Sequence, residues 1–255
     1  MEHYMRDILK DIVKHTHSLG IIQAVKVTTE GDDTRIDALD DNRTVVLKGK
    51  MHNRVDELEG KVGFGRLSVL QGYLNYEGED NEGKKVSANI NVNTEDRNGT
   101  KSPTSISFKL DSGFESVYRL IRSEVVDDQI KTANFKGAKW DVEVMPTQKA
   151  VADLRYFDSI LGAYDPLFTV KTVNGTLVFS IGGTGTDSVD LPFALNVGGE
   201  LKTSWAYPLK TVNTILRLAD TSNMSLKFSE MGAMMVQVDS GLGLYDYILP
   251  AKTGN

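Results

Sequence analysis

The 255-residue sequence contains no cysteine. Disulfide bonds, thiolate nucleophiles and zinc sites with cysteine ligands are therefore excluded, and the absence fits a reducing compartment. Long hydrophobic runs are absent too, since no stretch approaches the roughly 20 apolar residues that span a membrane. The first ten residues, MEHYMRDILK, are charged throughout, unlike a signal peptide. We therefore expect a cytoplasmic protein with no membrane-spanning helix.

Recognisable catalytic and metal sites are also scarce. His15 and His17 lie two residues apart on an expected helix and make a poor metal pair, so we expect solvated or phosphate-facing histidines. The glycine-rich stretch 181–187, IGGTGTD, lacks the helix and lysine of a phosphate-binding loop and favours a hairpin. Asp127 and Asp128 are adjacent, so their side chains diverge, which indicates a solvated linker. No Ser/His/Asp set has a catalytic signature, so we expect neither an enzyme nor a cofactor.

The length and composition are those of an ordinary soluble protein, with 40% hydrophobic and 25% charged residues. The length suits two domains of roughly 100–150 residues, or one large all-β unit. A core of that size needs no disulfide or metal to hold it. The net charge of −6 argues against a nucleic-acid-binding protein, because most such proteins are basic overall. The distribution of the charges matters more than their sum.

The stretch from Trp140 to Gly162, WDVEVMPTQKAVADLRYFDSILG, shows how the expected elements are built. Val142 and Val144 alternate with charged residues, which predicts a short strand. Thr147 follows a proline and is a candidate N-cap. In the helix that follows, the apolar residues recur at helical spacing and form one stripe of Ala150, Leu154, Phe157 and Leu161. The face of the helix opposite this stripe is mildly basic.

The same patterns divide the rest of the chain into helices and strands. Residues 126–139 have neither a helical nor a strand period, which predicts a connector. In the first half we expect helices at 5–19 and 62–74 and strands at 21–29, 34–39, 44–50, 86–92, 104–110 and 115–125. In the second half we expect helices at 147–163 and 207–219 and strands at 167–173, 176–181, 188–195, 225–229, 233–238 and 245–249.

Both halves run helix, strands, helix, strands, which is a structural repeat without obvious sequence identity. We predict an α+β protein with domains at 1–125 and 140–255, joined by an interdomain connector at 126–139. Each domain is expected to contain a pair of antiparallel sheets covered by two helices.

Charge is distributed unevenly over these elements. Acidic residues cluster in turns and loops, whereas the outward faces of the helices are basic or neutral. One interpretation is that lysines on an amphipathic helix simply face water. The other is that the helices of both halves line one surface, which would attract phosphates without reading base edges.

Three segments carry a resemblance to a known family. VEVMPTQKAVADLRYFDSILG resembles the opening of the second domain of DNA sliding clamps of the proliferating-cell-nuclear-antigen (PCNA) type. LKFSEMGAMMVQVDSGLGLYDYILPAK resembles the C-terminal hairpin of these clamps, with its Tyr-aliphatic-x-Pro ending. IDALDDNRTVVLKGKM resembles a turn of their first domain. The resemblance spans nearly the whole chain and rests on the order and spacing of the segments.

This resemblance implies the DNA clamp fold and a homotrimeric ring, with helices lining a central hole and sheets forming the outer wall. Such a ring encircles duplex DNA without sequence specificity and tethers the replicative DNA polymerase for processive synthesis. An ATP-dependent clamp loader opens and closes it at the replication fork. The clamp itself catalyses nothing and needs no cofactor.

The resemblance also implies roles for individual residues. The DNA-facing residues would be Arg6, Lys10, Lys14, Arg66, Lys149, Arg155, Lys210 and Arg217. The partner-binding groove would use Leu39, Thr44, Val126, Ile130, Tyr247, Ile248 and Pro250. Subunits would join edge to edge, strand 115–125 of one copy against strand 176–181 of the next, through Tyr118, Leu120, Leu177 and Phe179.

Two features depart from the family pattern. These clamps usually begin with a strand, whereas here a helix starts almost at once. Ala233 stands where the family often has proline, and Met234-Met235 follows. These departures favour a divergent, viral member, located in the host cytoplasm. The alternative from another class is a β-rich structural or assembly protein of virion type, whose helices only pack and which does not encircle DNA.

Overall fold

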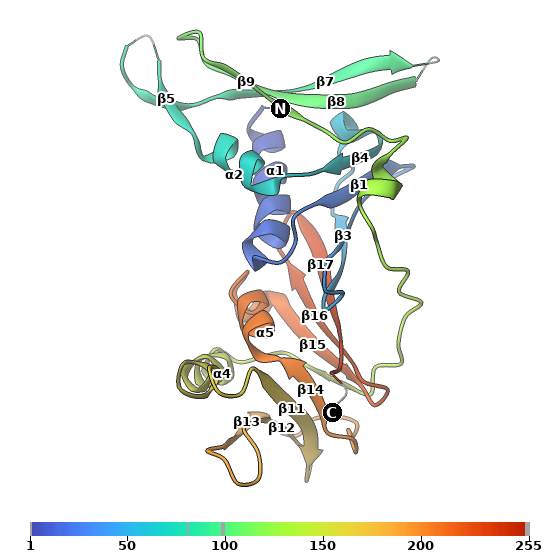
Figure 1. Cartoon of the computed structure of the whole chain (residues 1–255), viewed down its shortest axis with the longest axis vertical. Coiled ribbons are helices and arrows are strands. Elements are labelled where there is room, and N and C mark those ends of the chain that lie inside the picture. Colours follow the sequence, from blue (N-terminus) through green and yellow to red (C-terminus); the bar gives the residue numbers. More distant parts are fainter. Residues whose placement is uncertain (1, 81, 98–99, 253–255) are drawn as a thin grey trace. The chain divides into compact units, whose positions relative to one another are not determined.

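The computed structural model describes residues 2–80, 82–97 and 100–252, which fold into two compact units (Figure 1). The expected connector is divided between the units after Ala133. The first unit contains the chain up to Arg43, Leu47–Ala133 and Gly241–Leu244. The second unit contains Thr44–Val46, Asn134–Ser240 and the chain from Tyr245 onward.

The first unit is built from two main helices and two main sheets. Strands β3, β2, β1 and β4 lie side by side in that order, β7, β8 and β9 form a second sheet, and β5 pairs with β6. The helical elements are α1 (Glu2–Thr16), η1 (His17–Leu19), η2 (Asp56–Leu58), α2 (Leu67–Asn75) and α3 (Val126–Gln129). The strands are β1 (Val25–Glu30), β2 (Asp33–Leu39), β3 (Val46–Met51), β4 (Gly60–Phe64), β5 (Glu77–Glu79), β6 (Lys85–Ser87), β7 (Asn89–Arg97), β8 (Thr100–Lys109) and β9 (Glu115–Arg119).

Helix α1 confirms the expected amphipathic helix at 5–19, with its last turn tightened into η1. Its apolar side chains recur at helical spacing, and Ile8, Leu9 and Ile12 are almost completely buried. The helix lies against α2. Gly20 follows with a φ of 74°, a left-handed conformation that glycine adopts without strain at the end of a helix. Within the described residues no strand precedes α1.

The sheet of β3, β2, β1 and β4 turns one face to the core. Along β1, Val25 and Val27 are buried while Lys26 between them is partly exposed, because side chains alternate along a strand. β1 pairs antiparallel with both β2 and β4. Beyond β9, Ile121 forms a bridge to Gly63 of β4, with backbone hydrogen bonds of 2.7 and 3.0 Å.

The expected helix at 62–74 is wrong at its start. Val62 belongs to β4, opposite Val27 of β1, and α2 begins only at Leu67. Pairing with β1 supplies hydrogen bonds and apolar neighbours that local propensity does not register. A Cβ atom at Gly63 would lie 2.7 Å from the Ile130 side chain, so a larger residue here would push α3 away from the strand.

The second unit repeats this plan with two helices and two sheets. One sheet has the strand order β10, β15, β16, β17, and the other β13, β12, β11, β14. The helical elements are α4 (Gln148–Leu161), α5 (Leu209–Ile215) and η3 (Thr221–Asn223). The strands are β10 (Val142–Val144), β11 (Leu167–Val173), β12 (Thr176–Ile181), β13 (Val189–Ala194), β14 (Trp205–Pro208), β15 (Met224–Ser229), β16 (Ala233–Asp239) and β17 (Gly243–Pro250).

Aromatic rings join the two sheets of the second unit. Phe179 of β12 stacks on Phe193 of β13, with ring centroids 4.0 Å apart. The same ring lies 5.9 Å from Phe228 of β15, in the other sheet, and meets it edge to face. Such large apolar side chains bury enough surface to make the core of a domain of this size.

The two helices of this unit start in different ways: α4 has a threonine N-cap, and α5 follows a proline. Thr147 is the N-cap of α4, as predicted, because its Oγ1 accepts a hydrogen bond of 3.1 Å from the amide of Ala150. The helix expected at 207–219 starts later, since Trp205–Pro208 forms β14 and Tyr207 pairs with Phe168 of β11. Pro208, which has no amide hydrogen, ends the strand and precedes α5.

Candidate nucleic-acid interface and partner surfaces

Two lysines on α1 face solvent in the first unit. Lys10 and Lys14 lie one helical turn apart, away from the buried stripe, and both are exposed. Within residues 2–80, 82–97 and 100–252, neither lysine forms an ion pair. Their charges are therefore available to an anionic ligand.

Arg6, expected to face DNA, is withdrawn from the surface. Its side chain is only 8% exposed, and Nη1 donates a hydrogen bond of 2.8 Å to the carbonyl of Leu74. Nη2 donates to the carbonyl of Ala88. Burial lowers the pKa of this guanidinium from its usual value, partly offset by Asp7. The expectation for Arg6 is thus corrected: it joins α1 to the end of α2 and to the segment before β7.

His15 is also buried, contrary to the expectation of a solvated histidine. The residue has no exposed surface, and its Nε2 lies 3.7 Å from Asp11 one turn earlier. Burial, with a smaller contribution from the charge of Lys14, lowers the pKa of His15 to about 3. The imidazole is therefore neutral at pH 7 and belongs to the core.

Arg66 lies at the start of α2, with a φ of 51°. It lines a hollow of about 420 Å³ together with Arg119 and Arg122, which lie at the end of β9 and just beyond it. All three arginines are exposed. In the part of the chain that the structure describes, none of them forms an ion pair. This hollow is therefore basic and unoccupied by any acidic side chain of its own unit.

In the second unit the expected cations lie on two adjacent helices. Helices α4 and α5 pack together. Lys149 of α4 forms an ion pair with Asp153, which neutralises part of its charge. Lys210 at the start of α5 and Arg217 just beyond its end are both exposed. Among the described residues of this unit, Lys210 and Arg217 are therefore the exposed cations of the expected set that form no ion pair.

Arg155 is both a structural residue, bonded within the unit, and a partly exposed cation. It is half-buried, and its Nη2 donates a hydrogen bond of 2.7 Å to the carbonyl of Leu216. Burial, and then the nearby charge of Arg217, lower the pKa of Arg155 from its usual value. The two arginines are thus close enough to repel each other, so an anion placed near both would be stabilised.

The connector begins on the first unit and helps to line a second hollow. Leu39 and Ile130, both expected in the partner-binding groove, line a hollow of about 220 Å³ beside Asp40, Arg43 and Lys131. Val126, from the same expected set, is the first residue of α3 and is fully buried. Leu39 and Ile130 thus meet from positions 91 residues apart.

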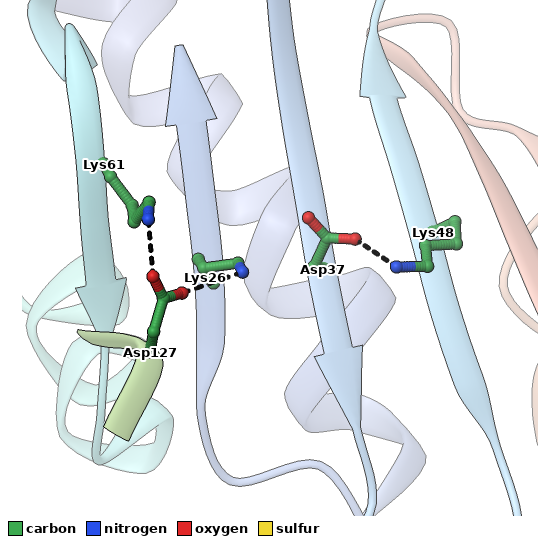
Figure 2. Close-up of polar contacts among 5 residues, drawn as sticks. All are labelled: Lys26, Asp37, Lys48, Lys61 and Asp127. Carbon is green, nitrogen blue, oxygen red and sulfur yellow. Dashed lines mark hydrogen bonds and ion pairs between the residues drawn. The ribbon is translucent and has the colours of Figure 1, made fainter. Parts of the chain in front are cut away.

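Asp127 holds α3 on the outer face of the sheet, as Figure 2 shows. One carboxylate oxygen accepts a hydrogen bond of 3.1 Å from Lys26 of β1, and the other accepts one from Lys61 of β4. These bonds, Lys61 first, lower the pKa of Asp127 below its usual value. Asp37 and Lys48 form a similar pair of 2.7 Å on the neighbouring strands β2 and β3. Asp127 therefore has two partners on the sheet and is not merely a solvated linker residue.

The remaining groove residues lie in the second unit. Tyr247 is fully buried and Ile248 almost so, both on β17. Pro250, the last residue of that strand, is exposed, and Thr44 is half-buried.

The expected pairing edges are corrected in part. β9 lies at one edge of its sheet, as required, with Tyr118 and Leu120 facing inward and the Tyr118 hydroxyl bonded to the carbonyl of Gly65. β12 cannot pair with another copy, because β11 and β13 flank it on both sides. Its residues Leu177 and Phe179 are fully buried core residues. The strands at the two edges of that sheet are β13 and β14.

Comparison with solved structures decides the fold. A structure described as the C-terminal region of FEN-1 bound to A. fulgidus PCNA matches with a TM-score of 0.70 at 10% sequence identity, covering 98% of this chain and 97% of that chain. PCNA from Thermococcus kodakaraensis matches with a TM-score of 0.65 at 12% identity, covering 97% of each chain. This chain has the PCNA-type sliding-clamp fold. The predicted α+β clamp architecture is therefore confirmed.

Comparison of structures finds the clamp fold, whereas comparison of sequences finds no relative. The sequence matches no protein-family model, and no curated protein matches it. At identities of 10–12% the likeness to the PCNA structures establishes the arrangement of the elements and leaves their functional residues to be argued from this chain.

Metal-binding and membrane-spanning features do not occur in the described parts of the clamp. Among these residues, no group of three or more His, Asp or Glu side chains is placed to hold a metal ion. No described helix is both long enough and apolar enough to cross a membrane. The glycine-rich stretch 181–187 forms the turn between β12 and β13, as predicted, closed by a 3.0 Å hydrogen bond from the Gly183 amide to Thr186.

Sequence patterns missed several residues of these surfaces. Arg119 and Arg122 join Arg66 in one hollow although more than 50 positions separate them from it. Lys26 and Lys61 meet Asp127 from positions 101 and 66 residues away. No local spacing encodes such pairs, because the strands that carry them become neighbours only when the sheet forms.

Proposed function

We propose that this chain is a sliding clamp. Three copies close into a ring around duplex DNA, without sequence specificity, and the ring tethers the replicative DNA polymerase for processive synthesis. The observation that carries the proposal is the match of the clamp fold to 98% of the chain, at a TM-score of 0.70. On this proposal the chain is a scaffold that catalyses nothing, and an ATP-dependent clamp loader opens and closes it.

The charges on the helices support a role on DNA. Lys10 and Lys14 in one unit, and Lys210 and Arg217 in the other, are exposed cations on a protein of net charge −6. Contacts to phosphates need no base recognition. A ring is held on DNA by its topology, so a few weak phosphate contacts per copy, repeated three times, leave it free to slide.

The hollow beside the connector supports a docking site for partner peptides. In the matched A. fulgidus structure, the C-terminal region of FEN-1 is bound to PCNA. We infer that a peptide segment of the polymerase binds this chain at Leu39 and Ile130. Val126, packed against Gly63 of β4, and Asp127, bonded to Lys26 and Lys61, position the connector beside this hollow.

Subunit assembly is proposed through the edge strands β9 and β13. Each is accompanied by exposed apolar side chains on the helix that packs against it. On α2, beside β9, Val69 is 36% exposed; on α4, beside β13, Tyr156 is 63% exposed and Ile160 45%. Joining the two edges would cover these side chains and leave no open strand edge to aggregate. Because the two surfaces differ, joining is head to tail, and three copies close into a ring when each contact rotates the next copy by a third of a turn.

The proposal is tested by mass and by retention on DNA. Light scattering should give three times the chain mass of 28.1 kDa. Loaded onto circular DNA with its loader and ATP, the clamp should survive a high-salt wash and be released when a restriction enzyme linearises the circle. A monomer at all concentrations, or equal salt sensitivity on circular and linear DNA, would refute the proposal.

A further inference from the structure

The free edge of β9 has two distinct faces. Tyr118 and Leu120 point into the core, whereas Val117 and Arg119 are exposed. The negative charge at the start of the strand is neutralised, because Glu115 forms a 2.9 Å ion pair with Lys109 of β8. The net charge of this edge is therefore carried by Arg119 and Arg122 at its far end.

The free edge of β13 is built in the same way but with opposite charge. Leu191 and Phe193 point into the core, whereas Asp190 and Pro192 are exposed. Pro192 has no amide hydrogen, which is typical of an edge strand. The acidic side chains lie at the beginning of this edge, at Asp190 and at Asp187 just before it.

Among the residues that the structure describes, both ends are charged without a neutralising partner in their own unit. Arg119 and Arg122 line the basic hollow of about 420 Å³ with Arg66. Asp190 accepts a hydrogen bond of 2.5 Å from the hydroxyl of Ser180, which orients the carboxylate without neutralising it. Across the described residues of the second unit, no cation pairs with Asp187 or Asp190.

One arrangement aligns the buried faces, overlaps the two strands and brings both arginines towards both aspartates. In a joined sheet the buried faces must coincide, so the register can shift only in steps of two residues. Parallel strands with Val117 opposite Pro192 would place Arg119 opposite Ala194, which carries no charge. Antiparallel strands with Val117 opposite Pro192 place Arg119 opposite Asp190, and they turn Arg122, just beyond the end of β9, towards the side of Asp187, just before the start of β13.

We propose that these two ion pairs set the direction and register of the contact between neighbouring copies, with the arginine hollow receiving the aspartates of the next subunit. This inference rests on the proposed ring and adds which residues meet in it. The pairs lie near the surface, so salt weakens them. The assembly therefore dissociates more readily at high ionic strength.

Disulfide trapping tests the register, because the chain has no native cysteine. Opposite residues of an antiparallel pair have Cβ atoms about 5 Å apart, within reach of a disulfide, whereas a shift of two residues moves them out of range. The double variant Val117→Cys/Pro192→Cys should therefore form covalent trimers on mild oxidation. The control Glu115→Cys/Pro192→Cys, which is shifted by two residues and keeps both proposed ion pairs, should not. Trapping of the control instead, or of neither pair while light scattering still shows a trimer, would overturn the register and leave the ring standing.

Charge reversal tests the ion pairs themselves. Arg119→Asp/Arg122→Asp replaces attraction by repulsion and should raise the protein concentration at which the trimer dissociates by about tenfold or more. Adding Asp187→Arg/Asp190→Arg to the same chain restores attraction and should return the value to within about threefold of the natural sequence. The exposed connector variant Lys136→Asp is the control and should change nothing. If the double reversal has no effect, or the fourfold variant is no better than the double, the ion pairs do not form. If the unaltered protein is monomeric, the ring itself fails.

Discussion

Arg6 and Lys10 lie one helical turn apart on α1, yet they contact different surroundings. The guanidinium of Arg6 is buried and bonded to the carbonyls of Leu74 and Ala88, whereas Lys10 is exposed. A buried carbonyl that loses a charged donor is left unsatisfied, which costs more than a lost surface charge. His15, nine residues beyond Arg6, is likewise a core residue. A basic residue on α1 therefore does not by its type alone belong to the proposed DNA-facing set.

We expect Arg6→Met to lower the free energy of unfolding by about 2–4 kcal/mol, because two carbonyls lose their donor. Lys10→Met should change it by no more than about 0.5 kcal/mol. Urea denaturation followed by circular dichroism measures both. If Arg6→Met is as stable as the natural sequence, the buried hydrogen bonds contribute nothing measurable.

His15 should make the protein sensitive to mild acid. Its pKa is lowered to about 3 in the folded chain, from an ordinary value of 6.5, so between these values the unfolded chain binds a proton that the folded chain does not. Stability is therefore highest above pH 6.5 and falls as the pH is lowered, by at most about 1.4 kcal/mol per pH unit from this group.

The measurement is the free energy of unfolding between pH 6.5 and 5, where most carboxylates remain ionised. His15→Gln should show a shallower slope than the natural sequence. The matched control His52→Gln, at an exposed position, should keep the original slope. An unchanged slope in His15→Gln would show that the buried imidazole does not resist protonation.

At the scale of elements, the connector is held by close apolar packing at Gly63 and by the hydrogen bonds of Asp127. α3 packs on β4 at Gly63, where a Cβ atom would lie 2.7 Å from Ile130 and 2.8 Å from Val126. Asp127 adds hydrogen bonds to Lys26 and Lys61, but its side chain is 54% exposed and contributes little stability. Apolar packing, more than charge, therefore fixes the connector.

We expect Gly63→Ala to destabilise the protein by about 1–3 kcal/mol, because the added methyl group overpacks the contact with α3. It should also loosen the connector, so that trypsin cleaves faster after Lys131 and Lys136. Gly72→Ala is the matched control: nothing lies within 4 Å of that position on α2, and the change should stabilise the helix by up to about 1 kcal/mol. Equal trypsin cleavage in both variants would mean that the contact at Gly63 does not hold the connector.

At the scale of the whole molecule, an acidic protein carries exposed cations on the helices of both units. A strongly basic lining would bind DNA tightly and slow sliding, whereas topology requires only weak contacts. In the proposed ring, topology keeps the protein on DNA and charge attracts the protein to DNA. The two properties can therefore be measured separately, the first by release from linearised DNA and the second by the rate of loading.

Reversing four lining charges, with Lys10→Glu, Lys14→Glu, Lys210→Glu and Arg217→Glu, should slow loading onto circular DNA by on the order of tenfold, because the phosphates are no longer attracted. The trimer mass should be unchanged. Lys136→Glu, an exposed position outside the helices, should load normally. Loading assays at two salt concentrations measure the effect; unaltered loading of the fourfold variant would show that these residues do not face DNA.

Local periodicity was enough to determine much of this protein. Helices α1 and α4 and the N-cap at Thr147 follow from apolar spacing and one hydroxyl, and strands β11 and β12 match their predicted ranges. The repeated order of elements in the two halves predicted two similar α+β domains, and the resemblance of three segments implied the clamp fold. These features depend on residues within a few positions of one another, and such neighbours are already present in the sequence.

Only the tertiary structure decided which residue is buried and which strand is an edge. Arg6 contacts carbonyls 68 and 82 positions away. Residues 62–64 became a strand because β1 lay beside them, and β12 is internal because β13 covers its outer side. The physical reason is the same each time: burial and strand pairing are set by the free energy of contacts between distant segments, and a local pattern does not contain the partner.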